Sequence, residues 1–131
     1  MFPNKETITL MKNYDQAAAK FDVLFLEDAV QFLDSLDVKA RDKIIYTITK
    51  ARFSNDKELF KKISDEIWEF RTLFNKTYYR LFAFWDKRQK QNTTVVITNG
   101  FIKKSQKTPR VEIEKANRLC NKYLNQKSNL P

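Results

Sequence analysis

The sequence predicts an α+β fold: an N-terminal strand, a helical hairpin, a three-stranded antiparallel segment that completes a small sheet, and a C-terminal helix. Three observations indicate this class. Apolar residues in the first half recur at spacings of three and four, as on the buried side of amphipathic helices. Beyond about residue 66, short aromatic and β-branched runs alternate with polar turns. A last helical stripe follows, and we expect all helices on one side of the sheet.

The length and composition fit one domain with a real core. The chain has 131 residues, 42% of them hydrophobic, with one glycine and one cysteine. We assign residues 1–20 to a poorly ordered or loosely docked leader, 21–125 to a single domain and 126–131 to a frayed tail. No apolar run is long enough to span a bilayer, so we expect a cytoplasmic protein without a membrane partner.

The first half predicts one strand, two helices and a short helical turn. Phe21–Leu26 is aromatic and aliphatic, as expected of a strand with a buried face. Asp37 is the expected N-cap of the second helix. A helical turn is expected over Lys57–Ile63, with Asn55 and Glu58 as a capping pair. The two apolar helical stripes are Leu26, Val30, Leu33 and Leu36, then Ala40, Ile44, Ile48 and Ala51.

Residues 67–74, 78–86 and 94–102 are interpreted as three antiparallel strands. If Asn75-Lys76 is a two-residue turn, Arg71 lies opposite Arg80. Such like charges destabilise a sheet unless a bound phosphate, or a carboxylate such as Glu69, neutralises them; an odd-length turn would remove the pairing. One face then carries Trp68, Phe70, Tyr79, Leu81 and Ala83, suited to covering the helical hairpin, and the other carries Glu69, Arg71, Tyr78, Arg80 and Phe82.

The last helix is expected to begin at Thr108 as N-cap and Pro109 as first helical residue. The single cysteine lies on its apolar stripe and is interpreted as a buried helix residue, and it excludes an internal disulfide. The stripe consists of Ile113, Ala116, Cys120 and Tyr123.

The net charge of +9 lies on one side of the sequence. Residues 1–66 carry 11 basic and 12 acidic side chains, whereas residues 67–131 carry 14 basic and 4 acidic ones. A one-sided excess attracts polyanions, with nucleic acid as the first candidate. The absence of histidine excludes a Ser/His/Asp triad, His-ligated metal sites and imidazole acid/base chemistry.

The run from Gly100 to Arg110 contains four cations and no acid, and it joins a strand to the start of a helix. The free N–H groups of a helix start favour anions, so we expect this run to bind phosphate. Most strand aromatics are interpreted as core, but Tyr78 lies beside the arginines and is a candidate for base stacking or proton transfer. The four cations are Lys103, Lys104, Lys107 and Arg110.

The segments Asp65–Arg71, Tyr79–Asp86, Gly100–Lys104 and Gln106–Pro109 resemble the phage-derived HigB-like branch of RelE/ParE toxins. The resemblance implies a RelE-like fold and a type II toxin that a cognate antitoxin, often with a helix-turn-helix domain, holds inactive. It also implies cleavage of mRNA on the ribosome by attack of the ribose 2′-hydroxyl, without a metal or other cofactor.

By this resemblance Arg80, Lys103 and Lys104 are the candidate catalytic residues, with a lysine as the hypothetical general base. Better-known members have a tyrosine or histidine near the last helix, whereas Thr108–Ile113 has neither. A ParE-like inhibitor of DNA gyrase and a noncatalytic nucleic-acid-binding module therefore remain alternatives. The remaining candidate RNA-binding residues are Arg71, Tyr78, Lys107 and Arg110.

Overall fold

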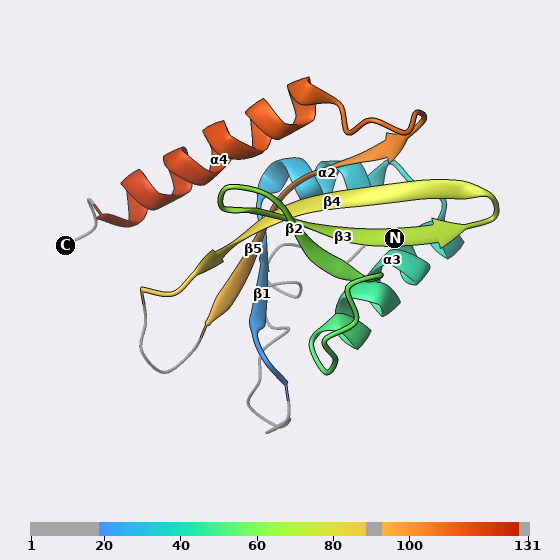
Figure 1. Cartoon of the computed structure of the whole chain (residues 1–131), viewed down its shortest axis with the longest axis horizontal. Helices are drawn as coiled ribbons and strands as arrows, with labels where there is room; N and C mark the ends of the chain where they lie inside the picture. Colours follow the sequence, from blue (N-terminus) through green and yellow to red (C-terminus); the bar gives the residue numbers. More distant parts are fainter. Residues whose placement is uncertain (1–18, 89–92, 129–131) are drawn as a thin grey trace.

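The computed structural model describes residues 19–88 and 93–128, which form a mixed α+β fold (Figure 1). The predicted N-terminal strand, helical hairpin, antiparallel strands and C-terminal helix are all present. Residues 1–18 of the predicted leader lie outside the described residues, and the last helix continues past the expected domain end at residue 125. The elements are β1 (Asp22–Phe25), α2 (Glu27–Asp34), α3 (Val38–Ala51), β2 (Phe60–Ser64), β3 (Ile67–Phe74), β4 (Thr77–Asp86), β5 (Thr94–Lys103) and α4 (Arg110–Ser128).

The strands form one sheet in the order β1-β5-β4-β3-β2. β1 pairs in parallel with β5, and the other neighbours pair antiparallel. The predicted three-stranded segment is therefore β3, β4 and β5, and the predicted N-terminal strand is β1, but the sheet is larger than expected because β2 adds a strand at the other edge. β4 is the middle strand, so side chains from both of its neighbours flank those that it carries.

The segment around residue 60 is a strand, and the helical turn predicted over Lys57–Ile63 is wrong. Residues 57–59 form a turn, after which β2 runs antiparallel to β3. The Phe60 ring stacks on Phe70 with 4.1 Å between ring centroids. The backbone N–H of Arg71 donates to the carbonyl of Leu59 at 2.8 Å. The chain therefore pairs with the free edge of β3, whose backbone groups need partners.

The predicted capping pair of Asn55 and Glu58 is also replaced. The carboxylate of Asp56 accepts a hydrogen bond from the backbone N–H of Glu58 at 2.8 Å, which stabilises the turn before β2. Asp37 does precede α3 as predicted, although its side chain makes no capping hydrogen bond.

The helices cover both faces of the sheet, so the prediction that they all lie on one side is wrong (Figure 1). Leu81 and Ala83 of β4 are buried in a cluster with residues of α2 and α3. Phe82 and Phe84 of the same strand are buried in clusters with residues of α4. A strand that is apolar on both faces has to be covered on both.

One end of the α4 face is left open. Leu73 and Tyr78 lie opposite each other across β3 and β4, and they are 55% and 49% exposed. Figure 1 shows α4 running away from the β3–β4 turn, so the helix does not reach this end. We call this part of the sheet, with the adjoining β5–α4 loop, the open face.

Candidate functional site

The β3–β4 hairpin places two arginines on the open face. Asn75 and Lys76 form its turn with positive φ angles of 53° and 64°, the backbone of a type I′ hairpin turn. Arg71 consequently lies opposite Arg80, and the predicted register is confirmed. The same alternation buries Tyr79 in the core, as expected.

A buried carboxylate lies between the two arginines. Glu69 Oε1 is 3.4 Å from Nε of Arg80, and Glu69 Oε2 is 3.7 Å from Nε of Arg71. Arg71 is also 3.9 Å from the carboxylate of the exposed Glu58. The pairing with Glu69 considered from the sequence is therefore present, and it stabilises two like charges that face each other.

Arg80 lies buried at the base of the open face, with a side chain only 5% exposed. Burial lowers the pKa of its guanidinium, while nearby Glu69 raises it. A guanidinium nevertheless stays protonated at neutral pH. Its Nη1 donates to the carbonyl of Tyr79 at 3.1 Å, and its Cζ lies 5.6 Å from the centroid of the Tyr78 ring. Arg80 is thus a fixed positive charge.

A cavity of about 460 Å³ opens beside Arg80. Lys103 at the end of β5 faces Tyr78 across the ladder, and the loop after it completes the wall. The lining contains three cations and no carboxylate, a combination that attracts an anion such as a phosphodiester. The lining residues are Tyr78, Arg80, Lys103, Lys104, Ser105 and Gln106.

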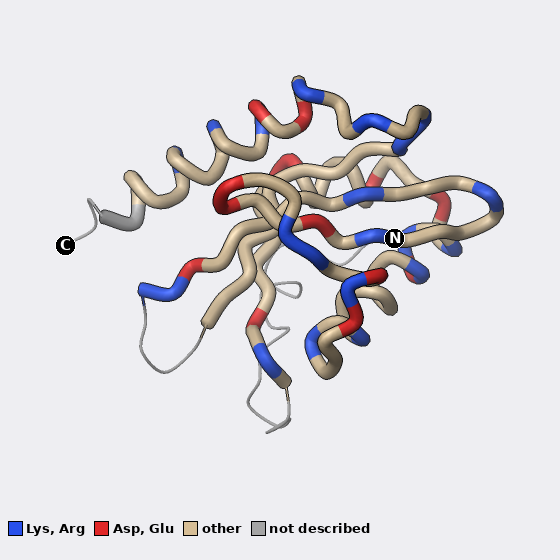
Figure 2. The backbone as a smooth tube through the Cα atoms, viewed as in Figure 1, with Lys and Arg blue, Asp and Glu red and all other residues tan. Residues whose placement is uncertain are grey.

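Four of the seven predicted site residues therefore meet at the cavity, and Arg71 adjoins it across the β3–β4 ladder. Neither Ser105 nor Gln106 was predicted from the sequence as a site residue. Both lie inside the basic run, and their position in that run was the available signal. Figure 2 shows Lys and Arg along the β5–α4 loop and at the β3–β4 turn, on two sides of the open face.

Lys107 and Arg110 are outside the cavity lining. The Arg110 side chain is 93% exposed and lies 3.3 Å from the carboxylate of Glu114. The carbonyl of Pro109 accepts the backbone N–H of Ile113, so Pro109 caps α4, one residue later than predicted. Arg110 is consequently the first helical residue, where the helix dipole does not favour its charge.

The tyrosine of the last helix lies elsewhere. Tyr123 packs edge-on against Phe84 and hydrogen-bonds with Asp86. Burial and the neighbouring Asp86 carboxylate raise the pKa of its phenol to about 12. It lines a separate cavity between α2 and α4. Tyr78, and not Tyr123, is therefore the tyrosine that lines the cationic cavity.

In the described part of the chain, no cluster of cysteine and carboxylate side chains is placed to hold a metal ion. No helix within residues 19–88 and 93–128 combines the length and the apolarity needed to cross a membrane.

The comparison with known proteins identifies a family. Residues 31–121, more than half of the chain, match the family described as Phage derived protein Gp49-like (DUF891). The match covers α3 to β5 and the first part of α4, and so includes every residue that lines the cavity. No curated protein matches the chain. The chain therefore belongs to the phage-derived Gp49-like family, a RelE/HigB-like toxin family of toxin–antitoxin systems.

Proposed function

We propose that this chain is the toxin of a type II toxin–antitoxin system and that it cuts mRNA on the ribosome. Family membership supports the toxin role. The single observation that carries the nuclease proposal is the cavity in which Arg80, Lys103 and Lys104 surround a space beside Tyr78. Cations fixed in advance around a phosphodiester stabilise the charge that develops as it is cleaved.

In the proposed reaction the ribose 2′-hydroxyl oxygen attacks the adjacent phosphorus, and the bond from phosphorus to the 5′-oxygen of the next nucleotide breaks. A general base takes the 2′-hydroxyl proton, and a general acid returns a proton to the leaving oxygen. The products are a 2′,3′-cyclic phosphate and a free 5′-hydroxyl. No metal or other cofactor takes part in this scheme, so the proton transfers fall to side chains.

The roles follow from position. Arg80, fixed by Glu69, stabilises the extra negative charge on the phosphorane. Lys103 or Lys104 serves as general base in this proposal, and the half-exposed phenol of Tyr78, which is the register partner of Lys103, returns the proton. The more distant cations bind the RNA backbone on either side of the scissile bond: Arg71, Lys107 and Arg110.

The proposed partner is a cognate antitoxin, in keeping with the family, and we expect it to carry a helix-turn-helix domain and to act with the toxin in the cytoplasm. A cationic open face fits an acidic or amphipathic antitoxin segment, because complementary charges speed association and exclude wrong partners.

The first experiment is induction of the chain without its antitoxin, with 5′ ends of cellular RNA mapped and DNA supercoiling measured in the same cells. Cuts in the reading frame of translated messages, absent when ribosomes are blocked before initiation, would support the proposal. Intact RNA together with lost supercoiling would instead support inhibition of DNA gyrase. Intact RNA and normal supercoiling would leave a noncatalytic binding module.

A matched pair of variants then tests the cavity. Lys104→Ala removes a cation from the lining, whereas Lys50→Ala removes another exposed cation from α3. We expect the first change to slow message cleavage at least about a hundredfold, the usual effect of losing a charge-stabilising or proton-transferring group. The second should leave the rate unchanged. Full activity of a folded Lys104→Ala protein would refute the role of Lys104.

A further inference from the structure

β2 adds a further cation to the same face of the sheet as the open face, and this cation lies outside the cavity. Lys61 is the register partner of Glu69 in the β2–β3 ladder. Residues paired across an antiparallel ladder point to the same face of the sheet, so Lys61 shares a face with Arg71 and Arg80. Because a helical turn was expected where β2 lies, no sequence pattern placed Lys61 near the site.

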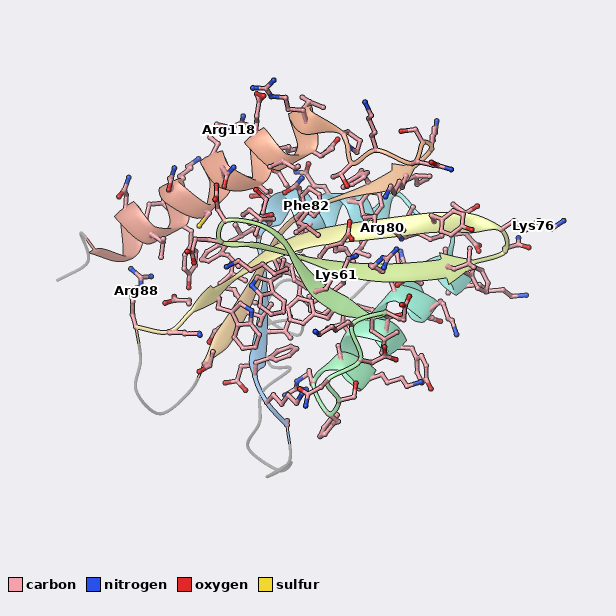
Figure 3. The ribbon with its side chains drawn as sticks, viewed as in Figure 1. Lys61, Lys76, Arg80, Phe82, Arg88 and Arg118 are labelled. Carbon is pink, nitrogen blue, oxygen red and sulfur yellow. The ribbon has the colours of Figure 1, made fainter. Side chains whose placement is uncertain are left out.

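The cations on this face follow an oblique line. Lys103 lies on β5 in register with Tyr78, Arg80 and Arg71 form the next row on β4 and β3, and Lys61 belongs to the row after that on β2. Figure 3 shows Arg80 between Lys61 and the β5–α4 loop. Four adjacent strands at about 4.8 Å spacing span roughly 14 Å, which is more than one nucleotide covers.

The cations along this line differ in how far they are already paired with carboxylates, and so in how available they are to an anion. The carboxylate of Glu69 is occupied by Arg71 and Arg80. Lys61 makes no ion pair with any described residue. A second carboxylate beside the line belongs to Glu58, whose side chain is 86% exposed and 3.9 Å from Arg71. An exposed ion pair of this kind is weak and is readily exchanged for a phosphate.

We infer that single-stranded RNA leaves the cavity over Arg80 and Arg71 and reaches Lys61, which binds a backbone phosphate outside the cleavage centre. We call this line the cationic track. The inference rests on the proposed RNA substrate, and it assigns Lys61 to binding and not to catalysis. Phosphate contacts position a strand without reading its sequence, so the track sets how much RNA the toxin holds and not which codon it prefers.

The test uses binding of 2′-O-methyl RNA, which lacks the attacking hydroxyl and so cannot be cut. Two probes are compared: a short one of about two nucleotides that fills the cavity, and a longer one of about eight that also covers the track. The variant is Lys61→Gln. Its control is Lys62→Gln on the same strand, because the exposed Lys62 is paired with Trp68 and belongs to the opposite face.

We expect Lys61→Gln to weaken binding of the longer probe several-fold and to leave the short probe within about twofold of the unchanged protein. The salt dependence should also fall, by about 0.7 in the slope of log K against log salt for one lost phosphate contact. Lys62→Gln should change neither quantity. Equal effects of the two variants on the longer probe would overturn the track.

A second variant is expected to change the affinity for the longer probe in the opposite direction. Glu58→Gln removes the carboxylate that competes for Arg71, so it should tighten binding of the longer probe about two- to fourfold. Unchanged or weaker binding would contradict the track. No binding of either probe at low salt would overturn both the track and the proposed RNA substrate. Binding that depends on Lys61 in a protein that does not cut messages would support the track and refute the nuclease.

Discussion

The only glycine of the chain stands at the start of the basic run, and the structure gives a steric reason for it. A Cβ atom built on Gly100 would lie 2.4 Å from Cδ2 of Phe32, whose ring α2 packs against β5. The φ angle of Gly100 is not positive, so the requirement is for space and not for backbone freedom. This close packing brings α2 onto the strand that ends at the cavity.

Gly100→Ala is therefore expected to destabilise the fold by about 1–3 kcal/mol, the usual cost of overpacking a core. The ring of Phe32 has to move to admit the methyl group, because real Cβ atoms essentially never lie within 3.0 Å of another heavy atom in this way. Urea unfolding followed by circular dichroism would measure the change. A Phe32→Leu background should reduce the cost, and a Gly100→Ala variant as stable as the unchanged protein would show that the packing is loose.

Glu69 is the residue on which the arginine pair depends. Glu69→Gln keeps the shape of the side chain but leaves the buried Arg80 without its counter-charge, and removing one partner of a buried pair costs about 3–5 kcal/mol. The control is Glu66→Gln, which alters an exposed residue of the β2–β3 turn. The midpoints of urea unfolding compare the two. A drop of the same size in both variants would show that Glu69 has no special role.

At the scale of single residues, the sequence predicts those contacts that depend on the alternation of side chains along a strand. The pairing of Arg71 with Arg80 follows from one two-residue turn, and the separation of Tyr78 from Tyr79 follows from the period of a strand. The participation of Ser105 depends instead on the path of a loop, which no short-range pattern specifies.

At the scale of elements, long periodic segments are predictable and short apolar ones are not. The run around Phe60 is compatible with either a helical turn or a strand, and the free edge of β3 decides between them. The stripe of α4 predicts that the helix is buried but not on which face. The deciding signal was available in β4, where Leu81 and Phe82 are both apolar and so require cover on both sides.

The hairpin turn provides an element-scale prediction. Lys76 adopts a φ of 64°, a left-handed conformation that costs about 1 kcal/mol for a residue with a side chain and almost nothing for glycine. Lys76→Gly converts the turn to Asn-Gly, the preferred type I′ pair, and should raise the free energy of unfolding by up to about 1 kcal/mol. Urea midpoints measure the gain. Thr77→Gly, on the strand beside the turn, should lower stability instead, and a loss in both variants would contradict the turn assignment.

Across the whole molecule, the end of the sheet opposite the cavity has its own polar anchor for α4. Asp86 at the end of β4 accepts two hydrogen bonds from the guanidinium of Arg88, at 2.9 and 3.1 Å, and it also bonds with Tyr123. Arg88 in turn donates to the carbonyl of Leu124 at 3.2 Å. The C-terminal half of α4 is thereby fixed to the sheet while its N-terminal end leaves the open face uncovered. This polar anchor and the cationic cavity therefore lie toward opposite ends of one helix.

The ion pair of Asp86 with Arg88 predicts how the stability of the protein changes with pH. Hydrogen bonds from Arg88 lower the pKa of Asp86 in the folded protein. A lowered carboxyl pKa gives stability that is fully present above the ordinary value of about 3.9 and is lost as the pH falls through the folded value. Asp86→Asn should therefore lower Tm by a few degrees at neutral pH, and the difference from the unchanged protein should shrink below about pH 4. The control is Asp42→Asn, which alters an exposed residue of α3. Because the anchor lies away from the cavity, the Asp86→Asn protein should still cleave messages at neutral pH. A Tm difference that stays constant across the acid range would show that the charge of Asp86 does not stabilise α4.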